Sequence, residues 1–334
     1  MKIAIITGSY PPDACGVGDY TYVLANKLKQ QGISVTVIKQ NRWTGREIKK
    51  LIKELKNYDV VHLQYPTQGY GYSLGPHLLS ILRPLVITIH EVSQAHIIRR
   101  FSLLAFTLRP IKLIFTTEFE KNYAEKHAPW IKGRTTFIPI GSNIPIGKRA
   151  GEREKQVVYF GLIYPKKNIE DFINLTELAH NSGLQIKFKI IGKVVDKFQS
   201  YYSELKEKSK NLPIEWLINL NDTEVANILS QTTFAYLPFP DGASDRRSSL
   251  LATLSNGVIT ITTQGLFTPK SMEKVVKFAN TPLDALQIIK SLIGREECLQ
   301  ILSRRSEEYA ERFSWEHIAM EHIEIYEEIA GGHK

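Results

Sequence analysis

Short apolar segments alternate with helical segments along the whole chain. The apolar segments occupy consecutive positions, which is typical of strands in a parallel sheet covered on both faces. Between them, segments such as residues 20–31 and 45–56 repeat apolar side chains at helical spacing. The pattern is therefore βαβ and predicts parallel sheets. The expected strands are residues 2–6, 34–38, 60–63, 85–89, 113–115 and 136–138, followed by 156–160, 187–191, 214–217, 234–237 and 258–262.

The hydrophobic pattern breaks around residues 144–155, where Pro, Gly and charged residues take over. This break predicts two α/β domains, residues 1–145 and 146–312. A strongly periodic helical segment, residues 313–330, follows them, and Ser314 is placed to cap its N-terminus. The chain has 334 residues and is 43% hydrophobic, which is enough for two separate cores.

The formal net charge of +9 is unevenly distributed. Residues 1–147 carry 19 Lys+Arg against 9 Asp+Glu, whereas residues 148–334 carry 24 against 25. The excess concentrates in a basic amphipathic helix at residues 39–56 and in residues 99–112, which mix arginines with large apolar side chains. Both patterns suit contact with an anionic membrane surface, and both also suit a solvated helix face. Nucleic acid is not expected as a partner, because no reader module is recognisable.

The cysteines, the N-terminal segment and the apolar runs of the sequence indicate the cellular compartment. Cys15 and Cys298 form no disulfide or metal pattern, which predicts a reducing compartment. No secretory signal is visible, and the longest apolar run is too short to cross a bilayer. We therefore expect a cytoplasmic protein, peripheral on the inner leaflet if the basic surface binds lipid.

Residues 238–257 predict an anion-binding cradle. An apolar strand leads into a loop of small residues, and a helix then begins near Ser248 and ends at Gly257. Uncovered N–H groups at such a helix start, beside two arginines, suit a phosphate or diphosphate. An ordinary turn with solvated arginines is the alternative. The residues assigned to this site are Asp241, Ser244, Arg246, Arg247, Ser248, Ser249 and Leu250, with the N–H groups of the last four pointing out of the helix.

Other candidate residues follow predicted strands, where ligands of open α/β sheets bind. A glycine-bearing loop after the first strand opens a helix, with Asp19 either capping that helix or binding an acceptor hydroxyl. A neutral imidazole at His90 could donate to a sugar hydroxyl, although a lone histidine is often structural. The remaining candidates are Gly16, Val17 and Gly18 for the diphosphate; Tyr20, His62 and Gln64 for the acceptor side; Gly161 and Lys167 for phosphate; and Gly192 and Leu217 near a nucleobase.

In order along the chain, these motifs resemble the retaining glycosyltransferases of family 4, which have the GT-B fold. The resemblance covers nearly the whole chain. It rests on motifs containing Tyr10-Pro-Pro, Gly16-Val-Gly18, Asp59-Val-Val-His62, Thr88-Ile-His90, Ile138-Pro-Ile-Gly141, Gly161 with Pro165 and Lys167, the cradle before Gly257, and Phe313-Ser-Trp315 with Tyr326.

The resemblance implies two facing Rossmann-like domains and a last helix that crosses back to the first. It also implies transfer of a sugar, with retention and without metal or cofactor, from a UDP- or GDP-linked donor to a glycan or lipid-linked acceptor. The chain departs from the family at three positions. Many members have an arginine at the position of Leu162 and glutamates at those of Ser244 and Ala252. Arg246 or Arg247 is expected to supply the missing positive charge.

The resemblance and the motifs together indicate an envelope or extracellular polysaccharide enzyme. Lys167, Arg247 and the amides of the cradle would stabilise the departing diphosphate. His90 would hold the donor sugar, and Asp19 would lie near the acceptor. A homologue that binds nucleotide or glycan without catalysis, and a nucleotide-sugar epimerase of the same fold, are the alternatives.

Overall fold

The structure is a computed structural model that describes residues 1–331 except 14, 94, 95, 97–100 and 150. The chain divides into two compact units, Met1–Ile140 with Ser314–Lys334, and Gly141–Phe313. The sequence-based boundaries, residues 145/146 and 312/313, lie within a few residues of these divisions. Arg99 and Arg100 of the second basic cluster lie outside the described residues.

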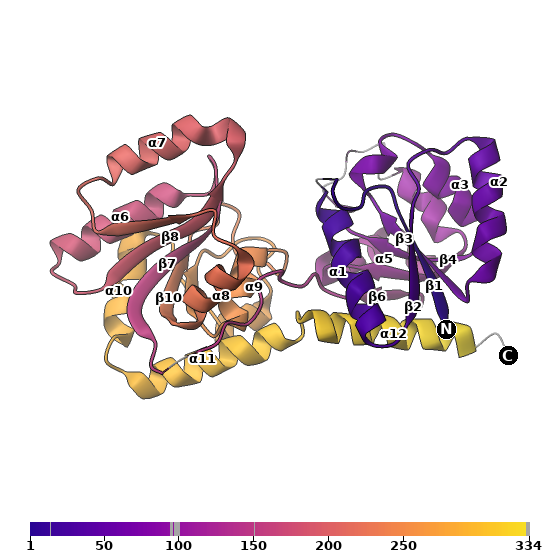
Figure 1. The fold of residues 1–334 in the computed structure, drawn as a ribbon. Coiled ribbons are helices and arrows are strands. Elements are labelled where there is room, and N and C mark those ends of the chain that lie inside the picture. The colour runs from indigo at the N-terminus through magenta and orange to yellow at the C-terminus, as the bar shows by residue number, and fades with distance from the viewer. Residues whose placement is uncertain (14, 94–95, 97–100, 150, 332–334) are drawn as a thin grey trace. The chain divides into compact units, whose positions relative to one another are not determined.

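Unit 1 contains one parallel sheet of strand order β2-β1-β3-β4-β5-β6 (Figure 1). All six predicted strands form, with small shifts at their ends. The strands are β1 (Lys2–Thr7), β2 (Ser34–Lys39), β3 (Val60–Tyr65), β4 (Leu85–Ile89), β5 (Pro110–Phe115) and β6 (Thr135–Phe137). The helices are α1 (Gly16–Gln30), α2 (Gly45–Glu54), α3 (Gly75–Leu82), α5 (Glu118–His127) and α12 (Trp315–Gly331), with 3-10 turns η1 (Leu55–Asn57), η2 (Gln68–Tyr70), η3 (Leu104–Thr107) and η4 (Pro129–Ile131).

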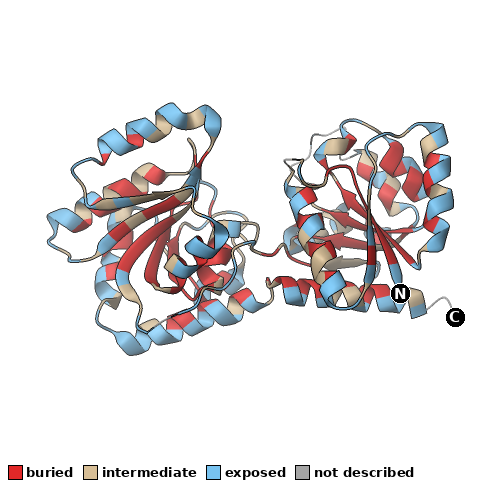
Figure 2. Ribbon diagram, in the orientation of Figure 1, coloured by how far each residue is buried: buried red, intermediate tan, exposed pale blue. Residues whose placement is uncertain are grey.

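The consecutive apolar residues of β1 serve two different cores. Ile3 and Ile5 belong to the core beneath α1 and α12, whereas Ala4 and Ile6 belong to the core that also contains Leu51 of α2 and Leu79 of α3. Successive side chains of a strand point to opposite faces, so a strand covered on both faces must be apolar throughout. Figure 2 shows the result as buried strands enclosed by helices whose outer faces are exposed.

Unit 2 contains a second parallel sheet of order β12-β11-β10-β7-β8-β9. Its strands are β7 (Glu154–Ile163), β8 (Lys187–Val194), β9 (Ile214–Ile218), β10 (Thr232–Leu237), β11 (Ile259–Thr262) and β12 (Lys277–Phe278). Its helices are α6 (Ile169–Asn181), α7 (Gln199–Lys208), α8 (Asp222–Ser230), α9 (Ser248–Ser255), α10 (Pro282–Leu292) and α11 (Glu296–Glu311), with η5 (Asp196–Phe198) and η6 (Lys270–Lys274). The short β12 was not predicted, because two residues carry no readable period.

Several helix ends follow their predicted signals. Ser314 Oγ accepts a hydrogen bond from the N–H of His317 at 3.2 Å, so it caps α12 as expected. Gly257 follows the end of α9 with φ of +66°, a conformation that glycine adopts without strain.

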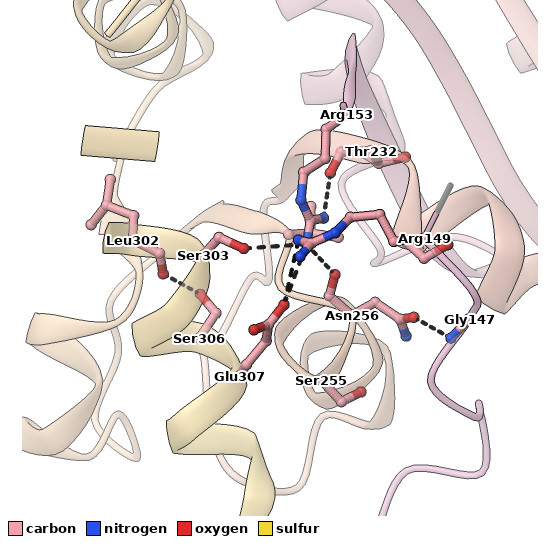
Figure 3. Close-up of polar contacts among 12 residues, drawn as sticks. Gly147, Arg149, Arg153, Thr232, Ser255, Asn256, Leu302, Ser303, Ser306 and Glu307 are labelled. Carbon is pink, nitrogen blue, oxygen red and sulfur yellow. Dashed lines mark hydrogen bonds and ion pairs between the residues drawn. The ribbon is translucent and has the colours of Figure 1, made fainter. Parts of the chain in front are cut away.

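The partly buried guanidinium of Arg153 joins the start of unit 2 to the end of α9 (Figure 3). The Arg153 side chain donates to Thr232 O at 2.9 Å and to Asn256 O at 2.8 Å, and it also contacts Glu307 of α11. Burial lowers the pKa of Arg153 to about 10, so the group stays charged at neutral pH. Asn256 Oδ1 also accepts the N–H of Gly147 at 2.8 Å. These contacts hold Gly147 and Arg153 against the C-terminus of α9.

Candidate functional site

Each sheet has one point where the order of strands along the chain reverses. In unit 1 the chain leaves β1 in one direction for β2 and returns to the other side of β1 as β3. In unit 2 it passes from β7 to β8 and β9, then returns beside β7 as β10. Loops that leave neighbouring strands in opposite directions at such a point open a crevice at the carboxyl edge, where open α/β sheets bind ligands. The predicted glycine loop follows β1, and the predicted cradle follows β10.

In the cradle of unit 2, helix α9 begins with backbone N–H groups that its own hydrogen bonds do not use. The first hydrogen bond of α9 runs from the N–H of Leu251 to Arg247 O at 2.9 Å. Within the part of the chain that the structure describes, no acceptor takes the N–H of Ser248, Ser249 or Leu250. The N–H of Arg247, by contrast, donates to Ser244 O at 3.0 Å. The prediction for Arg247 N–H was wrong, because a tight turn before the helix uses that donor.

The two cradle arginines are not simply solvated, as they would be in an ordinary turn. Arg247 forms an ion pair with Asp241 and lies over the ring of Phe239, 4.9 Å from its centroid. Asp241 therefore offsets part of the charge that Arg247 could offer a phosphate. Arg246 is partly buried in the same turn. Ser244 contributes its carbonyl to the turn.

The loop after β7 leaves the same sheet edge next to the cradle, because β7 pairs with β10. Lys167 lies in this loop, with its ammonium 5.1 Å from the ring centroid of Tyr164. Gly161 was expected to follow the strand, but β7 extends to Ile163 because its pairing with β8 continues that far. Gly161 and the exposed Leu162 are therefore strand residues.

Two backbones approach closely where β7 and β8 pair. A Cβ at Gly192 would lie 2.3 Å from Gly161 O, so only glycine fits there. Gly192 O also accepts the N–H of Asn219 at 2.9 Å, just after β9. Leu217 is a partly buried residue of β9. The predicted nucleobase region thus lies on β8 and β9, and its ligand role stays a prediction.

In unit 1, the loops after β1 and β3 interlock at the reversal point. Gly8 donates its N–H to Thr67 Oγ1 at 3.0 Å, and Gly69 donates its N–H to Ser9 Oγ at 2.8 Å. A Cβ at Gly69 would lie 1.9 Å from Gly8 O. Sequence reasoning missed Ser9, Thr67 and Gly69. The glycine at position 69, between Gln68 and Tyr70, was the readable signal for a close backbone approach.

Helix α1 begins one turn earlier than the sequence suggested. Its N-cap is Cys15, so Gly16, Val17 and Gly18 are the first three helical residues. Asp19 is therefore not the cap; it is an exposed carboxylate in the first turn, where the helix dipole favours negative charge. A Cβ at Gly18 would lie 3.0 Å from Ser9 O, a tighter approach than most Cβ contacts.

The Cys15 thiol occupies the N-terminus of α1. Burial acts to raise its pKa, but hydrogen bonding to the N–H groups of Gln68, Gly18 and Val17 and to Ser9 outweighs burial, so the pKa of Cys15 is lowered. The start of α1 is therefore a second place in the protein that favours negative charge.

A buried polar network lies behind His90 in unit 1. Gln64 Oε1 is 2.9 Å from His90 Nε2, and Gln64 Nε2 is 3.2 Å from His62 Nε2. Burial above all, then the neighbouring His322 and His90, place the pKa of His62 well below its ordinary value, so His62 is neutral. In this arrangement Gln64 donates to His62 and accepts from His90 Nε2–H. The amide of Gln64 thus selects the His90 form that carries a proton on Nε2.

The last helix completes this network. Tyr326 Oη of α12 is 2.6 Å from His62 Nδ1, and Thr88 Oγ1 is 2.7 Å from His62 Nε2. Tyr20 Oη contacts His322 Nε2 at 3.4 Å. Since Tyr20, His62 and Gln64 are all buried within unit 1, the prediction that they face an acceptor was wrong. His90 is only partly buried and lies edge-on to Tyr20, with ring centroids 4.9 Å apart.

Two absences concern the described residues alone. Within residues 1–331, apart from the gaps given above, no group of three or more His, Cys, Asp or Glu side chains could hold a metal ion. Across the same residues, no helix combines the length and the apolar composition needed to cross a bilayer.

Comparisons with known proteins agree on the architecture. No protein-family model matches the chain. An uncharacterized glycosyltransferase from Methanocaldococcus jannaschii is 25% identical over 294 residues, covering 85% of this chain and 79% of that protein. HepE from Anabaena, solved in complex with UDP, superposes with a TM-score of 0.72 at 17% identity over 97% of this chain and 99% of HepE. WaaG, a glycosyltransferase involved in lipopolysaccharide biosynthesis, gives a TM-score of 0.60 at 13% identity over 99% of this chain and 100% of WaaG. With two six-stranded parallel sheets, each flanked by helices, the chain has the GT-B fold of these glycosyltransferases.

Proposed function

We propose that the protein is a glycosyltransferase that moves a sugar from a nucleoside-diphosphate donor to a glycan or lipid-linked acceptor. The observation that carries this proposal is the open amide row of Ser248, Ser249 and Leu250 at the reversal point of a GT-B sheet. Backbone N–H groups at a helix start bind phosphate well. HepE, which shares the fold, was solved with UDP.

The main task of such an enzyme is to stabilise the departing diphosphate. Transfer breaks the bond between the anomeric carbon and the phosphate oxygen, and negative charge grows on the diphosphate as it departs. The amides of α9 are fixed before reaction, so they stabilise that charge without reorganising. Lys167 and one of Arg246 and Arg247 add positive charge at the same sheet edge.

Retention is proposed from the resemblance and from the absence of a clear nucleophile among the assigned residues. In front-face transfer, the acceptor oxygen forms its bond on the face that the diphosphate leaves, and the departing phosphate takes the acceptor's proton. His90 would hold the donor sugar through a ring nitrogen, and Asp19 would bind near the acceptor. No metal and no cofactor takes part in this scheme.

The cradle arginines offer a direct test of the compensation for Leu162. Replacing Arg246 or Arg247 by Ala should reduce kcat/KM by roughly 100-fold if that side chain contacts the diphosphate, since a charged hydrogen bond contributes about 3 kcal/mol. Because Asp241 already pairs with Arg247, Asp241→Asn should free Arg247 and tighten nucleotide binding. Unchanged kcat/KM in both arginine variants would remove the compensation.

The activity itself is tested with a panel of UDP-, GDP- and ADP-sugars. Nucleoside diphosphate release that requires an acceptor would support transfer. Product without acceptor would indicate an epimerase, and nucleotide binding without turnover would indicate a binding homologue. Thermal shift identifies the base, because a ligand at 100 times its dissociation constant stabilises by about 2.7 kcal/mol. A role in envelope or extracellular polysaccharide synthesis is proposed because WaaG, which shares the fold, is involved in lipopolysaccharide biosynthesis.

A further inference from the structure

Helix α3 in unit 1 is apolar on both of its faces. Its inner face is buried by Leu79 and by His77, whose ring stacks on Phe106 of η3 with centroids 4.6 Å apart. Its outer face repeats apolar side chains at i, i+4, i+7 and i+8, the spacing of a continuous helical stripe. These outer residues are exposed: Leu74 by 66%, Leu78 by 45%, Ile81 by 38% and Leu82 by 52%. A surface helix of a globular protein ordinarily shows polar residues there.

Segment η3 and the residue after it extend this apolar stripe. Leu104 and Leu108 are 44% and 62% exposed. Arg109 donates from its guanidinium to Ile81 O at 3.1 Å, which fixes the end of η3 beside the end of α3. Leu85 and Pro110, at the start of β4 and β5, also pair with each other, which keeps the segments before them side by side. Leu74, Leu78, Ile81, Leu82, Leu104 and Leu108 are called the apolar patch below.

The surroundings of the apolar patch are positively charged. Among the described residues of 60–117, Arg83, Arg109 and Lys112 are basic and only Glu91 is acidic. Helix α2 lies beside α3 (Figure 1), and Trp43 before α2 is in close contact with Gly75 at the start of α3. The exposed side chains of α2 include Arg46, Lys49, Lys50 and Lys53. An apolar surface beside a basic helix matches the two parts of an anionic lipid interface, its acyl boundary and its headgroups.

We propose that the apolar patch inserts into the interface of an anionic membrane while α2 binds the lipid headgroups. The exposed leucines would leave water for the acyl boundary, and the lysines of α2 would stay at the charged surface. No crossing of the bilayer is involved. The proposal does not depend on sugar transfer, because lipid binding is measured without donor or acceptor.

The test is sedimentation of the full chain with vesicles at low salt. Vesicles of phosphatidylcholine and phosphatidylglycerol in equal parts should carry the protein down, whereas pure phosphatidylcholine should retain much less. The triple variant Leu78→Gln, Leu82→Gln, Leu108→Gln should lower the partition coefficient of the protein onto vesicles by roughly tenfold or more. The reason is that three exposed apolar side chains are removed. Glutamine is a good helix former, so α3 keeps its propensity.

The matched control is Leu266→Gln with Leu283→Gln, two exposed leucines of unit 2, which should bind vesicles like the wild type. A second variant removes charge alone: Lys49→Gln, Lys50→Gln, Lys53→Gln should weaken binding to anionic vesicles by roughly 100-fold, at about fivefold per lysine. Its charge control, Lys208→Gln with Lys290→Gln in unit 2, should have little effect. Circular dichroism checks the folding of every variant.

Three results would overturn the proposal. The wild type could ignore anionic vesicles, both the leucine and the lysine variants could bind as the wild type does, or size exclusion with light scattering could show a dimer that the leucine variant dissociates. In the last case the patch would bind a second copy of the chain, and lipid would not be its occupant.

Discussion

Replacing Ser248 by Pro removes one donor from the amide row while leaving helix α9 in place. Ser248 is the first residue of α9, and its N–H has no acceptor in the described chain. Proline is favoured at this first position, because the missing N–H makes no helical bond there. Arg247 before it is extended, with φ of −85° and ψ of 93°, so it already lies outside the helical region that a following proline disfavours. The fold should therefore tolerate the change.

The magnitude follows from the charge of the ligand. A hydrogen bond to a charged group contributes about 1.5–3 kcal/mol, so losing one should reduce kcat/KM by roughly 10- to 150-fold. If the donor acts mainly on the departing diphosphate, most of this loss appears in kcat. The assay is steady-state release of nucleoside diphosphate with the best donor from the panel, together with the melting temperature without ligand.

Ser248→Ala is the matched control, because it removes the hydroxyl and keeps the N–H. It should retain most of the activity. Wild-type kcat/KM in a folded Ser248→Pro variant would refute the assignment of this amide to the diphosphate. Equal losses in both variants would assign the contact to the hydroxyl.

Three further predictions concern the stability of the packing inside unit 2 and inside unit 1. Gly192→Ala should destabilise unit 2 by about 2–3 kcal/mol, because its Cβ would lie 2.3 Å from Gly161 O; urea unfolding measures this, and an unchanged midpoint would contradict the close approach. Arg153→Met should lower the free energy of unfolding by about 3 kcal/mol, since Thr232 O and Asn256 O lose a charged donor; an equally stable variant would show that these carbonyls find other partners. Burial lowers the pKa of His322 to about 4, so the unfolded state binds the extra proton first as the pH falls. The stability this neutral group contributes is full above pH 6.5 and is lost toward pH 4, by up to about 3 kcal/mol. Urea unfolding across this range should show a flatter pH profile for His322→Gln, and an unaltered profile would refute the role.

The fold class and the positions of most strands follow from local sequence. Each predicted strand is a short apolar run. Its alternate side chains enter the cores on the two faces of the sheet, as Ile3 and Ala4 do. Gly257 and Ser314 also mark helix ends by chemistry that acts within a few residues. The open amides of Ser248, Ser249 and Leu250 were predicted for the same reason, because a helix start leaves its first donors uncovered whatever surrounds it.

The candidate residues that were misplaced depend on partners far away in the chain. Nothing near His62 shows that Tyr326, 264 residues later, accepts its hydrogen bond and that α12 helps to bury it. The start of α1 at Gly16 likewise depends on how the loop before it folds back. The sequence by itself determined which segments become strands and helices, because periodicity and capping are local. Only the tertiary structure decided which polar side chains face solvent and which exposed leucines adjoin one another, because strand order and long-range packing set those neighbours.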